Sequence, residues 1–347
     1  MSTKRRITLR DIAKKGGVSA TTVSLALRDH PSIPDNTRRR LKALAEKMGY
    51  RPDPLLSALS NLKTGKHRGD HHSLLVFVSD MPKDHWTNKP GGPIYTEFSA
   101  TANRGKELGY AVEYFCLQEF SQKRLNSILE ARGVRGLIVG ALQHEHRHLK
   151  FDWDRLVAVT LTHGLAHPSI PFVTHNNFKA VSTAWNKLRH LGYLRIGLLL
   201  SRFASSQAGH EWQAAQLLMQ QHPAVQDHIV PSLIQPEFTT REILNWIEDY
   251  QIEVILTIDG QVREKLKEGR YKIPKDIGFV HLDVLPIHNP DYSGIYQNRD
   301  LIGSSAVDLI HLMLQRGEVA SNCNRRGITI EGSWHEGKTT LKPRSDR

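Results

Sequence analysis

Apolar positions near the N-terminus recur at helical spacing in two short runs. Leu9, Ile12 and Ala13 lie on one face of a first helix. Gly17 ends that helix because glycine readily adopts the positive φ of a helix C-terminus, and Ser19 follows as a good N-cap. The inward positions of the second helix are again apolar: Val23, Ala26 and Leu27. This pattern predicts a helix-turn-helix, with an ordinary αα-hairpin as the alternative.

A third helix and a linker are expected next. Residues 35–37 offer caps, Gly49 stops the helix, and its apolar face carries Leu41, Leu44, Ala45 and Met48. A short helix over 54–60 follows, with Pro54 in its first turn. Residues 61–72 are polar and basic, which is typical of a linker.

From residue 74 onward, apolar strands alternate with amphipathic helices. Strands are expected at 74–79, 111–117, 136–140, 156–161, 172–174, 195–200, 229–233, 254–258, 277–282 and 328–330. Helices are expected at 95–108, 122–132, 180–191, 209–221, 240–250, 262–268 and 301–314. Such alternation predicts parallel sheets, here in two consecutive Rossmann-like α/β lobes.

The expected organisation is therefore an all-α headpiece followed by a two-lobed α/β body. Residues 1–60 form the headpiece, 61–72 the linker and 73–340 the body. Within the body, the first lobe takes about 73–174 and 298–318, and the second about 175–290 and 325–340. Three crossovers join the lobes, near 174–177, 289–297 and 317–326.

Charge is concentrated on the headpiece and linker. Residues 1–72 hold 16 Lys and Arg against 6 Asp and Glu, while the remaining 275 residues hold 31 against 29. A basic excess confined to one small domain is the electrostatic footprint of phosphate binding. The chain has no apolar run of the roughly 20 residues that cross a bilayer, and no signal-peptide core follows its basic start. We therefore expect no membrane partner and a cytoplasmic location.

Sequence motifs of catalysis and metal binding are missing. The chain contains no Gly-x-Ser-x-Gly elbow, phosphate-binding loop of the Gly-x4-Gly-Lys type or His-Glu-x-x-His helix. Cys116 and Cys323 alone exclude a disulfide framework and a cysteine-built zinc site. The run 144–148, His-Glu-His-Arg-His, suggests a metal site, but its basic surroundings favour a solvated loop. The expectation is a protein that is not an enzyme and has neither a metal nor a cofactor.

Residues 7–60 resemble the DNA-binding headpiece of the LacI/GalR family of bacterial repressors. The matching residues are Thr8-Leu9, Asp11-Ile12-Ala13, Gly17-Val18-Ser19, Thr22-Val23-Ser24, Ala26-Leu27, Thr37-Arg38, Gly49-Tyr50 and Pro52. The body is similar to the family's effector domain, which is related to periplasmic sugar-binding proteins. Its matches are 191–197, 273–280, Gln297, 301–303 and Ala306.

The resemblance implies a transcriptional regulator, with repression as the expected mode, that binds a palindromic DNA operator as a homodimer. It implies base-reading positions at Ala20, Thr21 and Leu25. None of these can make the bidentate purine contacts of Arg, Asn or Gln, so weak base discrimination is expected. It implies backbone contacts from Thr8, Ser19, Thr22, Ser24, Arg28 and Thr37. It also implies a hinge helix that inserts Leu59 into the minor groove.

The function of the hinge leucines is open. Leu55 and Leu56, with Leu59, contact the minor groove or pair the two hinge helices of a dimer. An ordinary apolar linker helix is the plainer reading. The family's usual residues are replaced here by Leu56 and Ser57.

A small-molecule effector is expected between the lobes, at the carboxyl ends of the strands. The candidate contacts are Asp80 and Trp86 on the first lobe, Arg202, Trp212, Asp259 and Asp283 on the second, and Gln297 at the hinge. Asp283 and Gln297 match effector contacts of the family. Trp212 stands where sugar-binding members carry Arg, and Ile258 where they often carry Asn. A Trp face suits a sugar ring, but the lost Arg and Asn count against a simple sugar.

Two other classes remain as alternatives. A secreted-type solute-binding protein would account for residues 74–335 but has no use for 7–60. A nonspecific nucleoid DNA-binding protein would account for the charge but not for two lobes with a cleft. The regulator accounts for both, acting on nucleoid DNA in a bacterial cytoplasm.

Overall fold

The computed structural model describes residues 8–27, 32–48, 73–88, 90–142, 147–223 and 228–341. The chain divides into two compact units, residues 1–71 and 72–347. The division falls at the end of the expected linker. The linker itself and the expected hinge helix lie outside the described residues.

The described residues of the N-terminal unit form the helices α1 (Leu9–Gly16), α2 (Ala20–Leu27) and α3 (Asp35–Lys47). Thr8 caps α1 in a capping box with Asp11, and Gly17 ends the helix with a φ of 64°. The helices enclose a small core of Ile12, Ala13, Val23, Ala26, Leu41 and Ala45. The predicted helix-turn-helix is therefore confirmed. The expected caps of α3 are wrong: Pro34 is the N-cap, and residues 35–37 form the first turn.

The first lobe of the body is built on a parallel six-stranded sheet in the order β13-β7-β5-β3-β1-β2. Its strands are β1 (Ser73–Ser79), β2 (Tyr110–Cys116), β3 (Gly136–Val139), β5 (Val157–Thr160), β7 (Phe172–His175) and β13 (Gly327–Ile330). A two-stranded ribbon, β4 (Arg147–His148) and β6 (Leu165–His167), lies beside it. The helices are α5 (Lys83–Thr87), α6 (Pro93–Glu107), α7 (Gln122–Ala131) and α13 (Arg299–Arg316).

Alternate side chains of β1 serve two cores on opposite faces of this sheet. Val76 and Val78 pack with α7, whereas Leu75 and Phe77 pack with α13. Because both faces are covered, the strands are almost continuously apolar, as parallel strands usually are.

The second lobe contains a six-stranded sheet in the order β14-β12-β11-β10-β8-β9. Its strands are β8 (Ile196–Ser201), β9 (Leu233–Gln235), β10 (Val254–Thr257), β11 (Gly278–His281), β12 (Ser293–Tyr296) and the antiparallel β14 (Ser333–His335). The helices are α8 (Asn177–His190), α9 (Arg202–Gln207), α10 (Glu211–Gln220), α11 (Thr240–Tyr250) and α12 (Gln261–Glu268). Helices α8 and α10 cover one face, and α11 and α12 the other.

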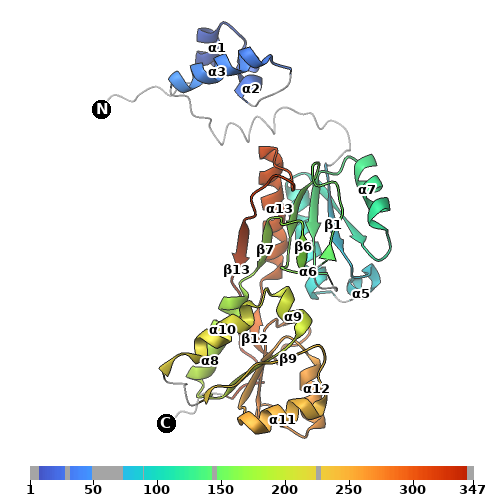
Figure 1. Cartoon of the computed structure of the whole chain (residues 1–347), viewed down its shortest axis with the longest axis vertical. Helices are drawn as coiled ribbons and strands as arrows, with labels where there is room; N and C mark the ends of the chain where they lie inside the picture. The colour runs from blue at the N-terminus through green and yellow to red at the C-terminus, as the bar shows by residue number, and fades with distance from the viewer. Residues whose placement is uncertain are drawn as a thin grey trace, which may run out of the picture. The chain divides into compact units, whose positions relative to one another are not determined.

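The chain crosses between the lobes after β7, after β12 and after β13 (Figure 1). The expected crossover at 289–297 is wrong in part, because β12 is a strand of the second lobe. The expected crossover at 317–326 is wrong, because β13 pairs with β7 in the first lobe, with Gly327 opposite Phe172. Residues 325–340 are therefore divided between the lobes. The side chains of β13 are mostly exposed, so its apolar pattern does not indicate which sheet it joins.

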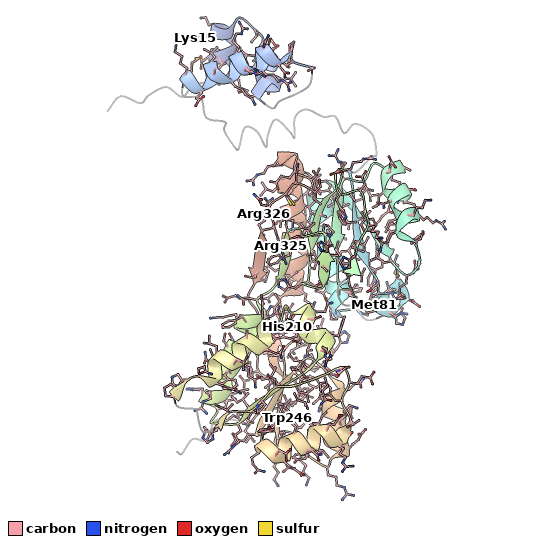
Figure 2. The ribbon with its side chains drawn as sticks, viewed as in Figure 1. Lys15, Met81, His210, Trp246, Arg325 and Arg326 are labelled. Carbon is pink, nitrogen blue, oxygen red and sulfur yellow. The ribbon has the colours of Figure 1, made fainter. Side chains whose placement is uncertain are left out.

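Figure 2 shows Met81 and His210 at the facing edges of the two lobes, and Trp246 within the second. In the part of the chain that the structure describes, no helix is long and apolar enough to cross a membrane.

Candidate functional site

The second helix of the helix-turn-helix presents its polar side to solvent. Thr21 is exposed, and Leu25 is half-buried without belonging to the core of the unit. Ala20 is half-buried and packs against that core. Of the three predicted base-reading side chains, Thr21 and Leu25 are thus the more available to a partner.

Four of the five predicted backbone contacts that the structure describes, Thr8, Ser19, Thr22 and Thr37, lie at helix starts. Ser19 Oγ accepts a hydrogen bond from the Thr22 amide at 3.0 Å and lies 2.9 Å from Thr22 Oγ1. Thr8 Oγ1 donates to Asp11 Oδ2 at 2.7 Å, so its hydroxyl already takes part in the capping box. Ser24 and Thr37 are half-buried on α2 and in the first turn of α3. Arg28 lies outside the described residues, as do the three hinge leucines Leu55, Leu56 and Leu59.

Basic side chains cover the outside of α1 and α3. The described residues of this unit carry eight Lys and Arg against three Asp and Glu. Lys15 projects from the end of α1, and Arg39 is exposed on α3 (Figure 2). Arg40 Nη2 donates to the Gly16 carbonyl at 3.2 Å, which joins α3 to the end of α1. The surface is suited to polyanions.

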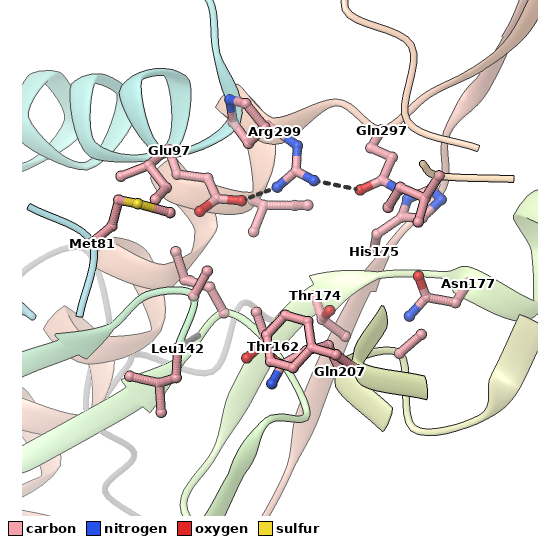
Figure 3. Close-up of a pocket in the computed structure, with 18 of the residues that line it drawn as sticks. Met81, Glu97, Leu142, Thr162, Thr174, His175, Asn177, Gln207, Gln297 and Arg299 are labelled. Atoms are coloured by element: carbon pink, nitrogen blue, oxygen red, sulfur yellow. Dashed lines mark hydrogen bonds and ion pairs between the residues drawn. The ribbon is translucent and has the colours of Figure 1, made fainter. Parts of the chain in front are cut away.

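A cavity of about 290 Å³ lies between the two lobes of the body. The first lobe lines it with apolar side chains such as Leu142, labelled in Figure 3, and Ile94, and the second with Phe203 and Trp212. The volume is near the lower end of the ~300–1,000 Å³ typical of small-ligand sites. Its place beside the ends of β5 and β7 is where open parallel sheets bind ligands.

Arg299, the first residue of α13, joins charged groups of both lobes at this cavity. Its Nη2 lies 2.5 Å from Asp283 Oδ2, and its Nε donates to Asp283 Oδ1 at 3.2 Å. Nη2 also donates to Gln297 Oε1 at 3.1 Å, and Nη1 donates to Glu97 Oε1 (Figure 3). Glu97 comes from α6 in the first lobe, whereas Asp283 follows β11 in the second. The guanidinium is therefore an interlobe link.

Several polar atoms in the cavity wall are buried without a hydrogen-bond partner. They are Glu97 Oε2, both ring nitrogens of His175, both amide atoms of Gln207 and Trp212 Nε1. Buried polar groups are nearly always hydrogen-bonded, because an unmet donor or acceptor costs about 1–3 kcal/mol. A group of such atoms around one cavity indicates a ligand that completes their bonding.

Burial also determines the protonation of the wall. It lowers the pKa of His175 to about 4, so the ring is neutral at pH 7 and offers one donor and one acceptor. Burial raises the pKa of Glu97, and the neighbouring Arg299 opposes that rise.

The structure places two of the seven expected effector contacts, Trp212 and Gln297, in the cavity wall. Asp283 is buried behind Arg299 and orients it. The other four lie away from the wall. Asp80 is fully buried, and Trp86 packs in an aromatic cluster, with its ring centroid 4.9 Å from that of Tyr114 at a tilted angle of 60°.

The last two of these four lie at helix starts. Arg202 is exposed at the start of α9, and Asp259 Oδ1 accepts the Gln261 amide at 2.9 Å at the start of α12. Polar residues after a strand are common helix caps, and so their position alone does not identify a ligand contact.

Sequence reasoning missed Glu97, His175, Gln207 and Arg299. One signal was present for Glu97: it shares the buried face of α6 with Ile94 and Thr101, three residues before and four after it. A carboxylate on the apolar face of a helix is uncommon without a partner. No comparable local signal marks His175 or Gln207, because their surroundings come from the other lobe.

No metal centre is built from the described residues, which hold no suitable group of three or more His, Cys, Asp or Glu. In the His-rich run, His148 stacks on His167 with the ring centroids 5.2 Å apart. Residues 143–146 lie outside the described residues.

Comparison with known proteins relates both units to bacterial regulators. Residues 8–53 match the family model described as bacterial regulatory proteins, lacI family. The chain is 27% identical over 194 residues to the HTH-type transcriptional regulator PtxS of Pseudomonas plecoglossicida, covering 56% of this chain and 53% of the relative. It thus spans about half of that relative's length. It is 22% identical over 320 residues to the HTH-type transcriptional repressor PurR of Mannheimia succiniciproducens, covering 87% of this chain and 90% of the relative.

Solved structures share the fold across nearly the whole chain. A lac repressor dimer bound to operator and the anti-inducer ONPF matches with a TM-score of 0.56 at 20% identity, covering 97% of this chain and 100% of that one. The regulator CelR in complex with cellobiose matches with a TM-score of 0.60 at 17% identity, covering 96% and 100%. At these identities the likeness shows a helix-turn-helix unit with a two-lobed, periplasmic-binding-protein-like body.

Proposed function

Because the chain belongs to the LacI family of bacterial regulatory proteins, we propose that it is a transcriptional regulator that represses by binding a palindromic operator as a homodimer. A small molecule in the interlobe cavity modulates that binding. One observation supports the whole proposal: a basic helix-turn-helix precedes a two-lobed body whose cavity is lined by unpartnered polar atoms. The protein acts by binding rather than by catalysis, uses no resident cofactor and works on DNA in the cytoplasm.

The size of α2 supports a dimer. An eight-residue helix in the major groove reaches only a few base pairs, so a second copy is needed for a specific site. A two-fold symmetric dimer then requires a palindromic operator.

The side chains of α2 predict how strongly the protein discriminates between DNA sequences. Thr21 offers one hydroxyl, and Leu25 offers an apolar contact to a thymine methyl group. Neither provides a bidentate contact to a purine. Phosphate contacts therefore contribute most of the affinity, and binding depends steeply on salt.

Ligand and DNA are coupled through the arrangement of the lobes. A small molecule that prefers one arrangement shifts the DNA affinity by its difference in affinity for the two arrangements. The side chains that would report such a change are those held by both lobes, Arg299 above all.

Selection from a pool of random DNA duplexes, using the full-length protein, tests the DNA-binding proposal. The expected result is an enriched palindrome whose electrophoretic shift weakens by at least tenfold between 50 and 200 mM salt, because about three or more phosphate contacts release counterions. Thr21→Asp puts a negative charge on the exposed side of α2 and should weaken the shift at least tenfold. Ser127→Asp adds the same charge on the exposed face of α7 and should leave the shift unchanged.

The alternatives give different outcomes. Uniform binding without an enriched site would indicate a nonspecific nucleoid protein, and no retention of DNA would indicate a solute-binding protein. If Thr21→Asp and Ser127→Asp changed DNA binding equally, α2 would not be part of the DNA interface.

A further inference from the structure

Two carboxyl groups and one guanidinium meet beside the interlobe cavity. Asp283 and Glu97 contribute two carboxylates, and Arg299 contributes one guanidinium. All three side chains are buried or nearly so, with Glu97 at 3% exposure and Asp283 at 6%. Among the side chains described as lining the cavity, Arg299 is the one permanent cation.

Arg299 has little capacity left for a ligand. Four of its contacts are already made inside the protein: two to Asp283, one to Gln297 and one to Glu97. A guanidinium has five N–H donors in a fixed plane, so a bidentate contact to a ligand carboxylate would require breaking existing pairs.

Glu97 is the group left incomplete. Its Oε1 accepts from Arg299, while Oε2 is buried and has no partner. Figure 3 shows the carboxylate at the cavity with one oxygen on Arg299 and the other turned away from it. An acceptor in this position needs a donor from whatever fills the cavity.

The remaining unpartnered atoms describe the rest of the ligand. Gln207 and neutral His175 each offer donors and acceptors, and Trp212 Nε1 is a donor only. A ligand that carries several hydroxyl groups, each both donor and acceptor, can meet all of them. Apolar side chains such as Ile258 and Leu161 cover the space between.

We propose that this cavity selects small ligands without negative charge, through a hydroxyl or amine group that donates to Glu97 Oε2. The inference rests on the cavity being the ligand site of the proposed regulator. Carboxylates and phosphates are excluded because they would face the unpartnered oxygen Glu97 Oε2 in a buried site whose guanidinium is already engaged.

Ligand triplets that share one pyranose ring test the proposal: D-glucose, D-glucosamine and D-glucuronate, with the matching galactose series. Binding to the full-length protein is measured by calorimetry without DNA. The expected result is that every member that binds is a neutral sugar or an amine, and that its acid binds at least 100-fold more weakly. Tighter binding of the amine identifies an ammonium donor, and tighter binding of the neutral sugar a hydroxyl donor; both support the proposal. An acid that binds as well as its neutral counterpart overturns it.

Glu97→Gln removes the charge while preserving the shape of the side chain. It should reduce the neutral-to-acid ratio, which is the affinity for the neutral sugar divided by the affinity for its acid, at least tenfold. Glu107→Gln, an exposed position on the same helix, should leave the ratio unchanged. If Glu97→Gln lowers the melting temperature too far for titration, Asp283→Asn removes one negative charge from the same group of side chains and should narrow the ratio likewise. A ratio that neither variant changes would show that these carboxylates do not select the ligand.

The calorimetric result is separate from DNA binding. Binding of an acid as tight as that of its neutral counterpart would overturn the proposed charge selection, but it would not contradict the proposed function as a regulator. Neutral or amine ligands that bind but never change the DNA affinity would contradict the proposed regulation and leave the selection intact.

Discussion

His175 is a buried imidazole that the fold keeps neutral. It ends β7, where the chain leaves the first lobe, and it is 3% exposed with neither ring nitrogen hydrogen-bonded within the protein. Burial lowers its pKa to about 4, although Asp283 nearby favours the charged ring. Its protonation is therefore linked to unfolding.

The sign of that linkage follows from the lowered pKa. Between pH 6.5 and about 4 the ring takes up a proton in the unfolded chain but not in the folded one. The wild-type protein should lose up to about 3 kcal/mol of unfolding free energy from this group as the pH falls through that window. His175→Asn should remove this part of the loss, as urea titrations at several pH values would show.

His190 supplies the control, because it is exposed at the end of α8. His190→Asn should follow the wild-type profile. If His175→Asn also followed it, the ring would be accessible to protons in the folded protein.

At the scale of elements, the turn between α1 and α2 depends on one backbone conformation. Gly17 has a φ of 64°, and a Cβ added there would meet no atom within 4 Å. The cost of a side chain is therefore conformational alone, roughly 1–2 kcal/mol for a left-handed L-residue. The turn directs α2, so this cost falls on the predicted DNA-binding unit.

Gly17→Ala should speed hydrogen exchange in peptides from residues 8–48 by about tenfold, while peptides of the body stay unchanged. Gly133 has the same φ of 64° and equally open space, but it follows α7 in the body. Gly133→Ala should therefore leave the hydrogen exchange of residues 8–48 unchanged and speed exchange in the body, where Gly133 lies. Faster exchange in both units with either variant would contradict the independence of the two units.

At the scale of the molecule, the two lobes share a buried ion network. Arg299 lies between Glu97 of α6 and Asp283 of the second lobe. Arg104 has a similar arrangement on the surface, where it pairs with Glu107 and Asp308. The two arginines differ mainly in their access to water.

Arg299→Met should lower the unfolding free energy by about 3–5 kcal/mol, because two buried carboxylates lose their counterion. Arg104→Met should lower the unfolding free energy far less than Arg299→Met, since water solvates the exposed carboxylates. Urea unfolding followed by tryptophan fluorescence measures both, as every tryptophan lies in the body. Similar losses in the two variants would show that the Arg299 network is solvated.

The helix-turn-helix and most of the α/β alternation follow from the order of residues along the chain. Both depend on interactions between residues a few positions apart: the cap at Thr8, the left-handed Gly17 and the spacing of Ile12 and Ala13. Central strands such as β1 and β10 were recognisable because they are buried on both faces. β12 is as short as β10 and largely buried, but Ser293 and Gly294 leave it without an apolar run, and it was missed. β13 and β14 are exposed or half-buried; β13 was assigned to the wrong lobe, and β14 was missed.

Only the tertiary structure decided the composition of the cavity. Glu97 and Arg299 are 202 residues apart in the chain, and they meet because parallel sheets and interlobe crossovers bring distant segments together. The apolar periodicity of a helix or strand indicates which of its residues are buried, but not which charged residue of another element lies against them. The sequence therefore indicated a cleft with Trp212 and Gln297, while the fold brought Glu97 and Arg299 together in its wall.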